Sequence, residues 1–99
     1  MIRHIVSWQF ADGFTPEEKK QNAETIKARL LALKDIIPEI EELDVCCDML
    51  PGSNCDFLLS SLFKSQTDLD TYAAHPEHIK IGLDIKTLFT ARRCADFIV

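Results

Sequence analysis

The sequence predicts an α+β fold in which the elements follow the order β-α-β-β-α-β. Three observations carry this prediction. Apolar and polar residues alternate over 2–10, a helix-start signature occupies 15–18, and Pro38 and Pro76 interrupt the helical patterns around them. Because one sheet and two long helical segments need to cover each other's apolar surfaces, this order predicts a ferredoxin-like sandwich with the helices on one sheet face.

The first strand is expected at residues 2–10, followed by a turn at 11–14. The strand alternation assigns one set of side chains to a common face, namely Ile2, His4, Val6, Trp8 and Phe10. Thr15 then fits the N-cap of a helix, Pro16 its first position and Glu18 the partner in a capping box. Its buried face repeats at helical spacing through Ile26, Leu30, Leu33 and Ile37. Pro38 should end this helix near residues 34–36.

Two further strands are expected at residues 40–50 and 56–64, joined by the turn cluster 51–54. In the first of them, alternation assigns one face to Leu43, Val45, Cys47 and Met49. A second helix should begin after Ser65, with Leu69, Tyr72 and Ala73 on its inner face. His75-Pro76 interrupts it, and Pro76 begins a further helix through about residue 90 whose inner side carries His78, Ile81, Gly82, Ile85 and Phe89. Residues 92–99 should form the last strand.

Both faces of the predicted sheet are apolar, which helices on one side cannot explain. The third strand carries Phe57, Leu59 and Phe63 on one side and Leu58 and Leu62 on the other. The second set is joined by Ile5, Phe97 and Val99. A patch of this size is unusual on a monomer, so we expect a homodimer in which two sheets pack face to face. The alternative is a monomer with scattered exposed apolar residues.

Composition and charge restrict the class of protein. The chain of 99 residues fits one domain, residues 1–99, and its net charge of -5 argues against a nucleic-acid or anionic-membrane partner. No apolar run is long enough for a membrane span, and no secretory signal is present. The four cysteines include no Cys-x-x-Cys pair, so we expect reduced thiols and a cytoplasmic location.

The segment from Tyr72 to His78 is the strongest candidate for a functional site. It places two of the three histidines and the single tyrosine of the chain within seven residues. His75 precedes a proline and should lie at a helix break, whereas His78 falls in the first turn after it. A helix N-terminus disfavours a charged imidazole, which would leave His78 neutral and available as a base, with the Tyr72 hydroxyl directed into the same space. The alternative is that His75 is a cap and that the other two side chains only pack.

His4 and Asp96 are candidate pocket residues on neighbouring strands. In a ferredoxin-like sheet the first and last strands are adjacent, so a contact of Asp96 with His4 or with His78 is expected, because a buried carboxylate needs a partner. The spacing of His4, His75, His78 and Asp96 matches no metal-ligand signature, and no glycine-rich phosphate loop is present. We therefore expect neither a metal nor a cofactor.

Several of these segments resemble the stress-responsive A/B barrel domain family, in order and over nearly the whole chain. They are residues 1–6, Ile37-Pro38-Glu39-Ile40, Asp56-Phe57-Leu58-Leu59, Tyr72-x-x-His75-Pro76-x-His78 and Asp96-Phe97. The resemblance implies a dimeric α+β barrel, and many members are named for induction under stress. In plant polyketide cyclases of the family, a tyrosine and a histidine matching Tyr72 and His78 carry out an aldol-type ring closure, in a pocket near residues matching His4 and Asp96.

The chain departs from those cyclases at two positions. Phe57 and Lys27 stand where they carry a histidine and a tyrosine, which counts against the same substrate. The leading expectation is a homodimer that binds a small, largely apolar or aromatic molecule between sheet and helices. The enzyme alternative is a cofactor-independent lyase, cyclase or isomerase with His78 as general base and Tyr72 stabilising an enolate. A third reading is a structural stress protein whose histidines only pack.

Overall fold

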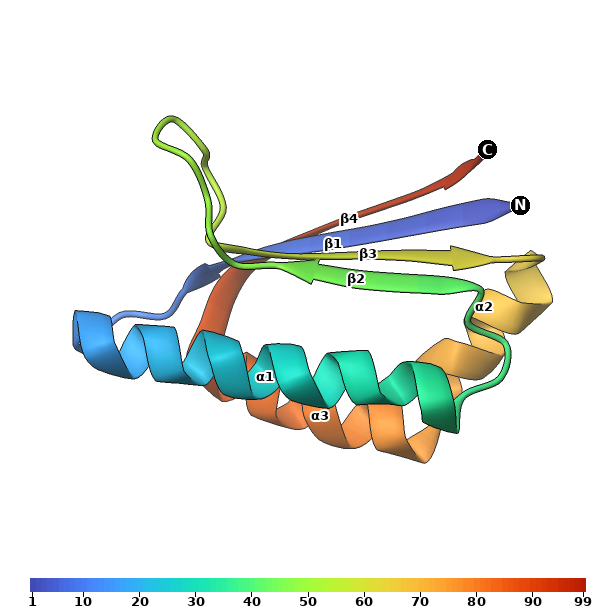
Figure 1. Ribbon diagram of the computed structural model, residues 1–99, viewed down its shortest axis with the longest axis horizontal. Helices are drawn as coiled ribbons and strands as arrows, with labels where there is room; N and C mark the ends of the chain where they lie inside the picture. Colours follow the sequence, from blue (N-terminus) through green and yellow to red (C-terminus); the bar gives the residue numbers. More distant parts are fainter.

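A computed structural model describes residues 1–99 and confirms the ferredoxin-like α+β fold. The elements are β1 (Ile2–Phe10), α1 (Pro16–Ile36), β2 (Glu42–Cys46), β3 (Phe57–Phe63), α2 (Gln66–Ala74), α3 (Pro76–Leu88) and β4 (Phe89–Ile98). The strands form one antiparallel sheet in the order β2-β3-β1-β4. All the helices lie on one side of this sheet, and the two termini lie close together at one end (Figure 1). The sheet therefore has one covered face and one open face.

Helix α1 begins and ends where its local signals predict. The Thr15 side chain accepts from the Glu18 amide, and the Glu18 carboxylate accepts from the Thr15 amide, which completes the capping box. The helix ends at Ile36, two residues before Pro38. Its predicted inner face is buried between the sheet and α3, through Ile26, Leu30, Leu33 and Ile37.

Strand β2 is shorter than the predicted strand 40–50. The sequence alternation continues through Cys47 and Met49, but the strand ends at Cys46, which pairs with Leu58 near the start of β3. Beyond this pair no partner strand is available, and the connection rises away from the sheet as a loop (Figure 1). At the other end, the Ile40 amide donates to the Ile37 carbonyl in a turn rather than to a strand.

The boundary between α3 and β4 also differs from the prediction. The helix ends at Leu88 rather than near residue 90, because Phe89 is already extended and pairs with Phe10. Next to this pair the register shifts: Ser7 lies opposite Arg93 and Gln9 opposite Thr90, so two residues of β4 face Trp8 alone. The extra residue makes a β-bulge, with Ala91 at a positive φ of 53°.

The open face of the sheet carries the apolar residues that the sequence assigned to it. Leu62 pairs with Arg3 on one neighbouring strand and with Glu42 on the other. Arg3 and Glu42 form an ion pair of 3.3 Å across Leu62, which is almost fully buried. Phe97 and Val99 remain 44% and 58% exposed. No helix covers this side (Figure 1). None of the helices is both long and apolar enough to cross a lipid bilayer.

Candidate functional site

A small apolar cavity lies between the sheet and the helices, at the place where the sequence candidates meet. Its volume is about 250 Å³. Strands β1, β3 and β4 form one wall and helices α1, α2 and α3 the others. It is lined by His4, Val6, Trp8, Leu30, Leu59, Tyr72, Ala73, His78, Gly82, Ile85, Lys86 and Arg92. Three of the five predicted site residues, His4, Tyr72 and His78, therefore share one cavity.

Tyr72 is buried in the cavity wall, and its hydroxyl has no protein hydrogen-bond partner. Its side chain is 1% exposed, and its ring packs on Phe63 with centroids 5.1 Å apart. Burial raises the pKa of Tyr72 above the ordinary value of 10.0, because the phenolate would lose its solvation. The hydroxyl therefore stays protonated, and it is a donor that no protein group uses.

His78 lies beside Tyr72 in the first turn of α3, with ring centroids 4.4 Å apart. Its Nδ1 is 3.1 Å from the Ala73 carbonyl oxygen. Because a carbonyl only accepts, Nδ1 carries the hydrogen, and the neutral ring keeps a lone pair on Nε2. Burial lowers the pKa of His78, and the charges of His4 and Arg92 act in the same direction against the hydrogen bond to Ala73. The ring is therefore neutral near pH ~7, as a general base needs to be.

The sequence left open whether Asp96 contacts His4 or His78, and in the structure its partner is His4. The two residues are paired across β1 and β4, and the Asp96 carboxylate accepts a hydrogen bond from His4 Nδ1. The His4 ring is almost fully buried and meets Tyr72 edge-on, with centroids 6.1 Å apart. Asp96 does not line the cavity. Its carboxylate fixes the orientation of the His4 ring from outside, so that Nε2 is the ring nitrogen that Asp96 does not bind.

His75 does not belong to the cavity. It ends α2 and caps α3, and its Nδ1 accepts the Glu77 amide at 3.1 Å. The imidazole therefore serves the backbone, as the capping alternative in the sequence analysis proposed. Ala73, predicted on the inner face of α2, is instead exposed at the cavity rim, one residue before the end of the helix.

One group of side chains has the donor atoms of a metal site. His4, Cys94 and Asp96 bring a nitrogen, a sulfur and an oxygen within 4.8 Å of one another. Such a mixed set is within the range that zinc accepts. In this structure, however, the His4 nitrogen and the Asp96 oxygen are hydrogen-bonded to each other. In addition, burial and the Asp96 charge raise the pKa of the Cys94 thiol. The group is best described as a hydrogen-bonded pair with a protonated thiol beside it.

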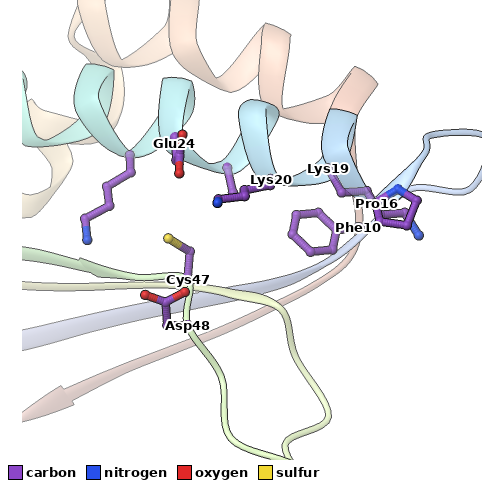
Figure 2. A pocket seen from close by; sticks show the side chains of 9 residues that line it. Phe10, Pro16, Lys19, Lys20, Glu24, Cys47 and Asp48 are labelled. Carbon is purple, nitrogen blue, oxygen red and sulfur yellow. The ribbon is translucent and has the colours of Figure 1, made fainter.

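A second, larger cavity of about 550 Å³ lies at the other end of α1 (Figure 2). Lys20 and Glu24 of α1 face Cys47 and Asp48, which follow β2, while Phe10 closes one side (Figure 2). Lysines and carboxylates alternate around it, and none of the predicted site residues lies there. None of the side chains around the larger cavity has a buried polar atom without a partner, as Tyr72 has, so we regard the smaller cavity as the candidate site.

The two departures from the plant cyclases lie outside the candidate cavity. Lys27 lines the larger cavity rather than the smaller one. Phe57 is fully buried in an aromatic cluster with Trp8 and Phe89, at centroid distances of 5.8 Å and 4.9 Å. It fills the core next to the cavity with hydrocarbon where a histidine would bring a polar group.

Sequence reasoning missed Arg92 and Lys86, which line the candidate cavity. A signal for Arg92 was present: it shares the strand parity of Asp96, for which a contact with His4 or His78 was expected. Lys86 lies one helical turn after Gly82, on the predicted inner side of α3. The cavity therefore combines an apolar wall, one unpartnered hydroxyl, two imidazoles and two cationic side chains. This set can bind a small molecule, and it can accept and donate a proton.

Comparison with known proteins gives the fold and the family. A structure from Bacteroides fragilis, a dimeric protein of unknown function with a ferredoxin-like fold, is 31% identical, with a TM-score of 0.92 over 99% of this chain and 95% of that chain. A dimeric ferredoxin-like protein of unknown function from Thermobifida fusca is 25% identical, with a TM-score of 0.84 over 99% and 90%. A hydroxynitrile lyase from Passiflora edulis has a TM-score of 0.82 over 99% and 92%, but at 18% identity it is similar in fold alone.

At the level of sequence, no curated protein matches the chain. The family model described as the stress-responsive A/B barrel domain matches residues 2–99. This match spans all strands and helices of the structure, including the cavity between them. The chain belongs to the stress-responsive A/B barrel domain family.

Proposed function

We propose that the protein is a homodimer whose subunits each bind one small, largely apolar molecule in the cavity between sheet and helices. The observation that carries this proposal is the Tyr72 hydroxyl, which is buried without a protein partner in a cavity wall. Leaving a buried hydroxyl unpaired costs about 1–3 kcal/mol, so a fold that retains one is expected to use it. Seven of the twelve lining residues are hydrophobic, which suits an apolar ligand body.

The dimer is supported by the uncovered sheet face. Ile5, Leu58 and Leu62 continue into the exposed Phe97 and Val99, and the similar structures from Bacteroides fragilis and Thermobifida fusca are dimeric. Two such faces packed together would close into a dimeric α+β barrel. The four free cysteines fit a reducing, cytoplasmic environment.

Sedimentation at micromolar concentration tests the dimer. Leu58→Asp places a charge on the open face and should yield monomers or aggregate. Leu83→Asp is the matched control, because Leu83 is 60% exposed on α3, on the helical side. This variant should remain dimeric. A wild-type chain that sediments as a stable monomer would contradict the proposal.

A thermal-shift screen of aromatic and polyketide-like compounds tests ligand binding. Compounds that raise the unfolding midpoint of the wild type should lose this effect in Tyr72→Phe and His78→Ala. Lys20→Gln, in the larger cavity, should keep it. If no compound stabilises the wild type, or if Lys20→Gln is the variant that loses the response, the candidate cavity is wrongly assigned.

A second function, cofactor-independent enolisation, is favoured by the protonation states in the cavity. His78 offers a lone pair on Nε2, and Tyr72 offers a hydroxyl that burial keeps protonated. Nε2 would take the proton from a carbon next to a carbonyl, the electron pair would move to the carbonyl oxygen, and the Tyr72 hydroxyl would donate to the enolate oxygen. This chemistry is common to lyases, cyclases and isomerases without cofactors.

Hydrogen–deuterium exchange at the acidic carbon of a β-keto ester, followed by NMR above the buffer rate, tests this function. Wild type should accelerate the exchange, His78→Gln should abolish the acceleration, and Tyr72→Phe should reduce it about 100-fold, the usual loss for one oxyanion donor. An exchange rate that His78→Gln leaves unchanged would exclude His78 as the base and leave the binding function alone.

A further inference from the structure

The bulge in β4 determines which of two adjacent arginines enters the cavity wall. Counting by twos from Phe89, which faces the helices, would place Ala91 and Arg93 on the helical side. The extra residue opposite Trp8 reverses this alternation. Arg92 consequently lines the cavity, whereas Arg93 lines a surface hollow with Ser7 and Gln9 on the open side.

This arrangement is held against a backbone preference. Ala91 adopts a φ of 53°, in the left-handed region that costs a residue with a Cβ roughly 1–2 kcal/mol. Glycine would avoid the cost, and alanine carries no side-chain group that hydrogen-bonds locally in compensation. Backbone strain of this kind persists where the surrounding structure requires it, and often next to a site. Here its direct consequence is the position of Arg92.

The cavity that receives Arg92 is positively charged and has no acidic counterpart. Its lining includes Arg92 and Lys86 and no aspartate or glutamate. Neither cation forms an ion pair, although Arg3, Arg29, Lys64 and Lys80 all do. The chain as a whole has a net charge of -5, so this local excess is opposite to the average of the surface. The charge of Arg92 also contributes to lowering the pKa of His78.

We propose that Arg92 is a specificity-determining residue and that the ligand of this cavity is an apolar molecule bearing a carboxylate. This inference rests on the proposed binding function and names its ligand class. A guanidinium binds a carboxylate with two parallel hydrogen bonds, and Lys86 adds a second positive charge on the opposite wall. The apolar residues take the ligand body, and the volume of about 250 Å³ restricts it to a body smaller than a typical drug.

The polar groups then divide into two sets along the ligand. Arg92 and Lys86 hold the anionic group at the rim, since both residues are exposed. Tyr72, which is buried, and His78, which is half-buried, lie next to each other, where they would meet the part of the ligand near the carboxylate. A ligand with a carbonyl or hydroxyl group close to its carboxylate would satisfy both sets.

Matched acid and amide probes test this inference. Benzoate, 2-naphthoate and hexanoate are compared with their neutral amides by calorimetry on wild type, Arg92→Gln and Arg93→Gln. Arg93→Gln is the control, since it removes the same charge from the adjacent residue on the other face. In wild type at least one acid should bind about tenfold or more tighter than its amide, the usual scale of a hydrogen bond to a charged group. Arg92→Gln should remove this preference and leave amide binding unchanged, and Arg93→Gln should keep it.

The outcomes separate this inference from the proposed function. If amides bind as tightly as acids in wild type, the ligand class is wrong, while binding in the cavity stands. If Arg92→Gln weakens acid and amide equally, Arg92 only packs, and if Arg93→Gln has the same effect as Arg92→Gln, the preference reflects overall charge. If no probe of either kind binds at millimolar concentration, the binding function itself fails. Arg92→Gln should fold normally, because Arg92 is exposed and forms no ion pair, and its unfolding midpoint checks this.

Discussion

Replacing Tyr72 with phenylalanine should separate the stability of the fold from the use of its cavity. The hydroxyl is buried and has no protein partner, so removing it leaves no donor or acceptor unpaired. The desolvation cost of an unsatisfied hydroxyl is about 1–3 kcal/mol, part of which cavity water can offset. The free energy of unfolding of Tyr72→Phe should therefore be unchanged or about 1 kcal/mol higher than that of wild type. For a domain of this size, 1 kcal/mol corresponds to roughly 4–8 °C in the unfolding midpoint.

Urea unfolding without ligand, at one fixed protein concentration, measures this difference, since linked association changes the apparent midpoint. Tyr72→Ala is the control. It removes a ring that packs on Phe63 and His78 and should lose about 3–5 kcal/mol, as large-to-small core changes do. If Tyr72→Phe loses more than about 1 kcal/mol, the hydroxyl makes a structural hydrogen bond in solution, and the argument that the fold keeps it for a ligand is wrong.

Further predictions concern other residues near the cavity. Because burial lowers the pKa of His78 below 6.5, the unfolded chain binds this proton more readily than the folded one, so stability should fall as pH drops from about 7 to 5. His78→Gln should flatten this slope in urea titrations, and an unchanged slope would contradict it. Ala91→Gly should raise the free energy of unfolding by about 0.5–1 kcal/mol, because glycine adopts a φ of 53° without a Cβ penalty; calorimetry showing a lower midpoint would refute this. His75→Ala should lower the free energy of unfolding by about 1 kcal/mol, because it removes the acceptor of the Glu77 amide, whereas His75→Asn should retain most of this stability. Equal losses in the two variants would show that the cap does not stabilise the fold. Thermal midpoints with and without reductant should agree, because all cysteines are free, and a large drop under reductant would indicate a disulfide.

The elements that the sequence predicted well are those with local signals. Thr15 and Glu18 form the predicted capping box, and the alternation in β1 places His4 on the buried face as expected. His75 and Pro76 divide the two C-terminal helices because a proline excludes the helical conformation from the residue before it. Each of these features depends on a few neighbouring residues, so the sequence contains the whole cause.

The elements that differed depend on residues distant in the chain. The alternation in β2 continues beyond Cys46, but a strand needs a partner, and β3 begins only at Phe57. The bulge in β4 has no sequence signal either, since Ala91 is not a residue type that favours a positive φ. In the candidate site the same distinction holds: the proximity of Tyr72 and His78 follows from one helical segment, whereas the choice of His4 as the partner of Asp96 depends on strand pairing.

The bulge at Ala91 also links the cavity to the open face of the sheet. With the extra residue, Arg92, Cys94 and Asp96 lie on the helical side, and Ala95 and Phe97 on the open side. Without it, the pattern from Phe89 onward would be reversed, because a shift of one residue exchanges the two faces of a strand. His4 would then lose its carboxylate partner and the cavity its arginine, while the open face would lose Phe97 and gain polar groups. One strained residue thus maintains both the polar groups of the cavity and the apolar residues of the open face, which gives a physical reason for retaining a conformation that alanine disfavours.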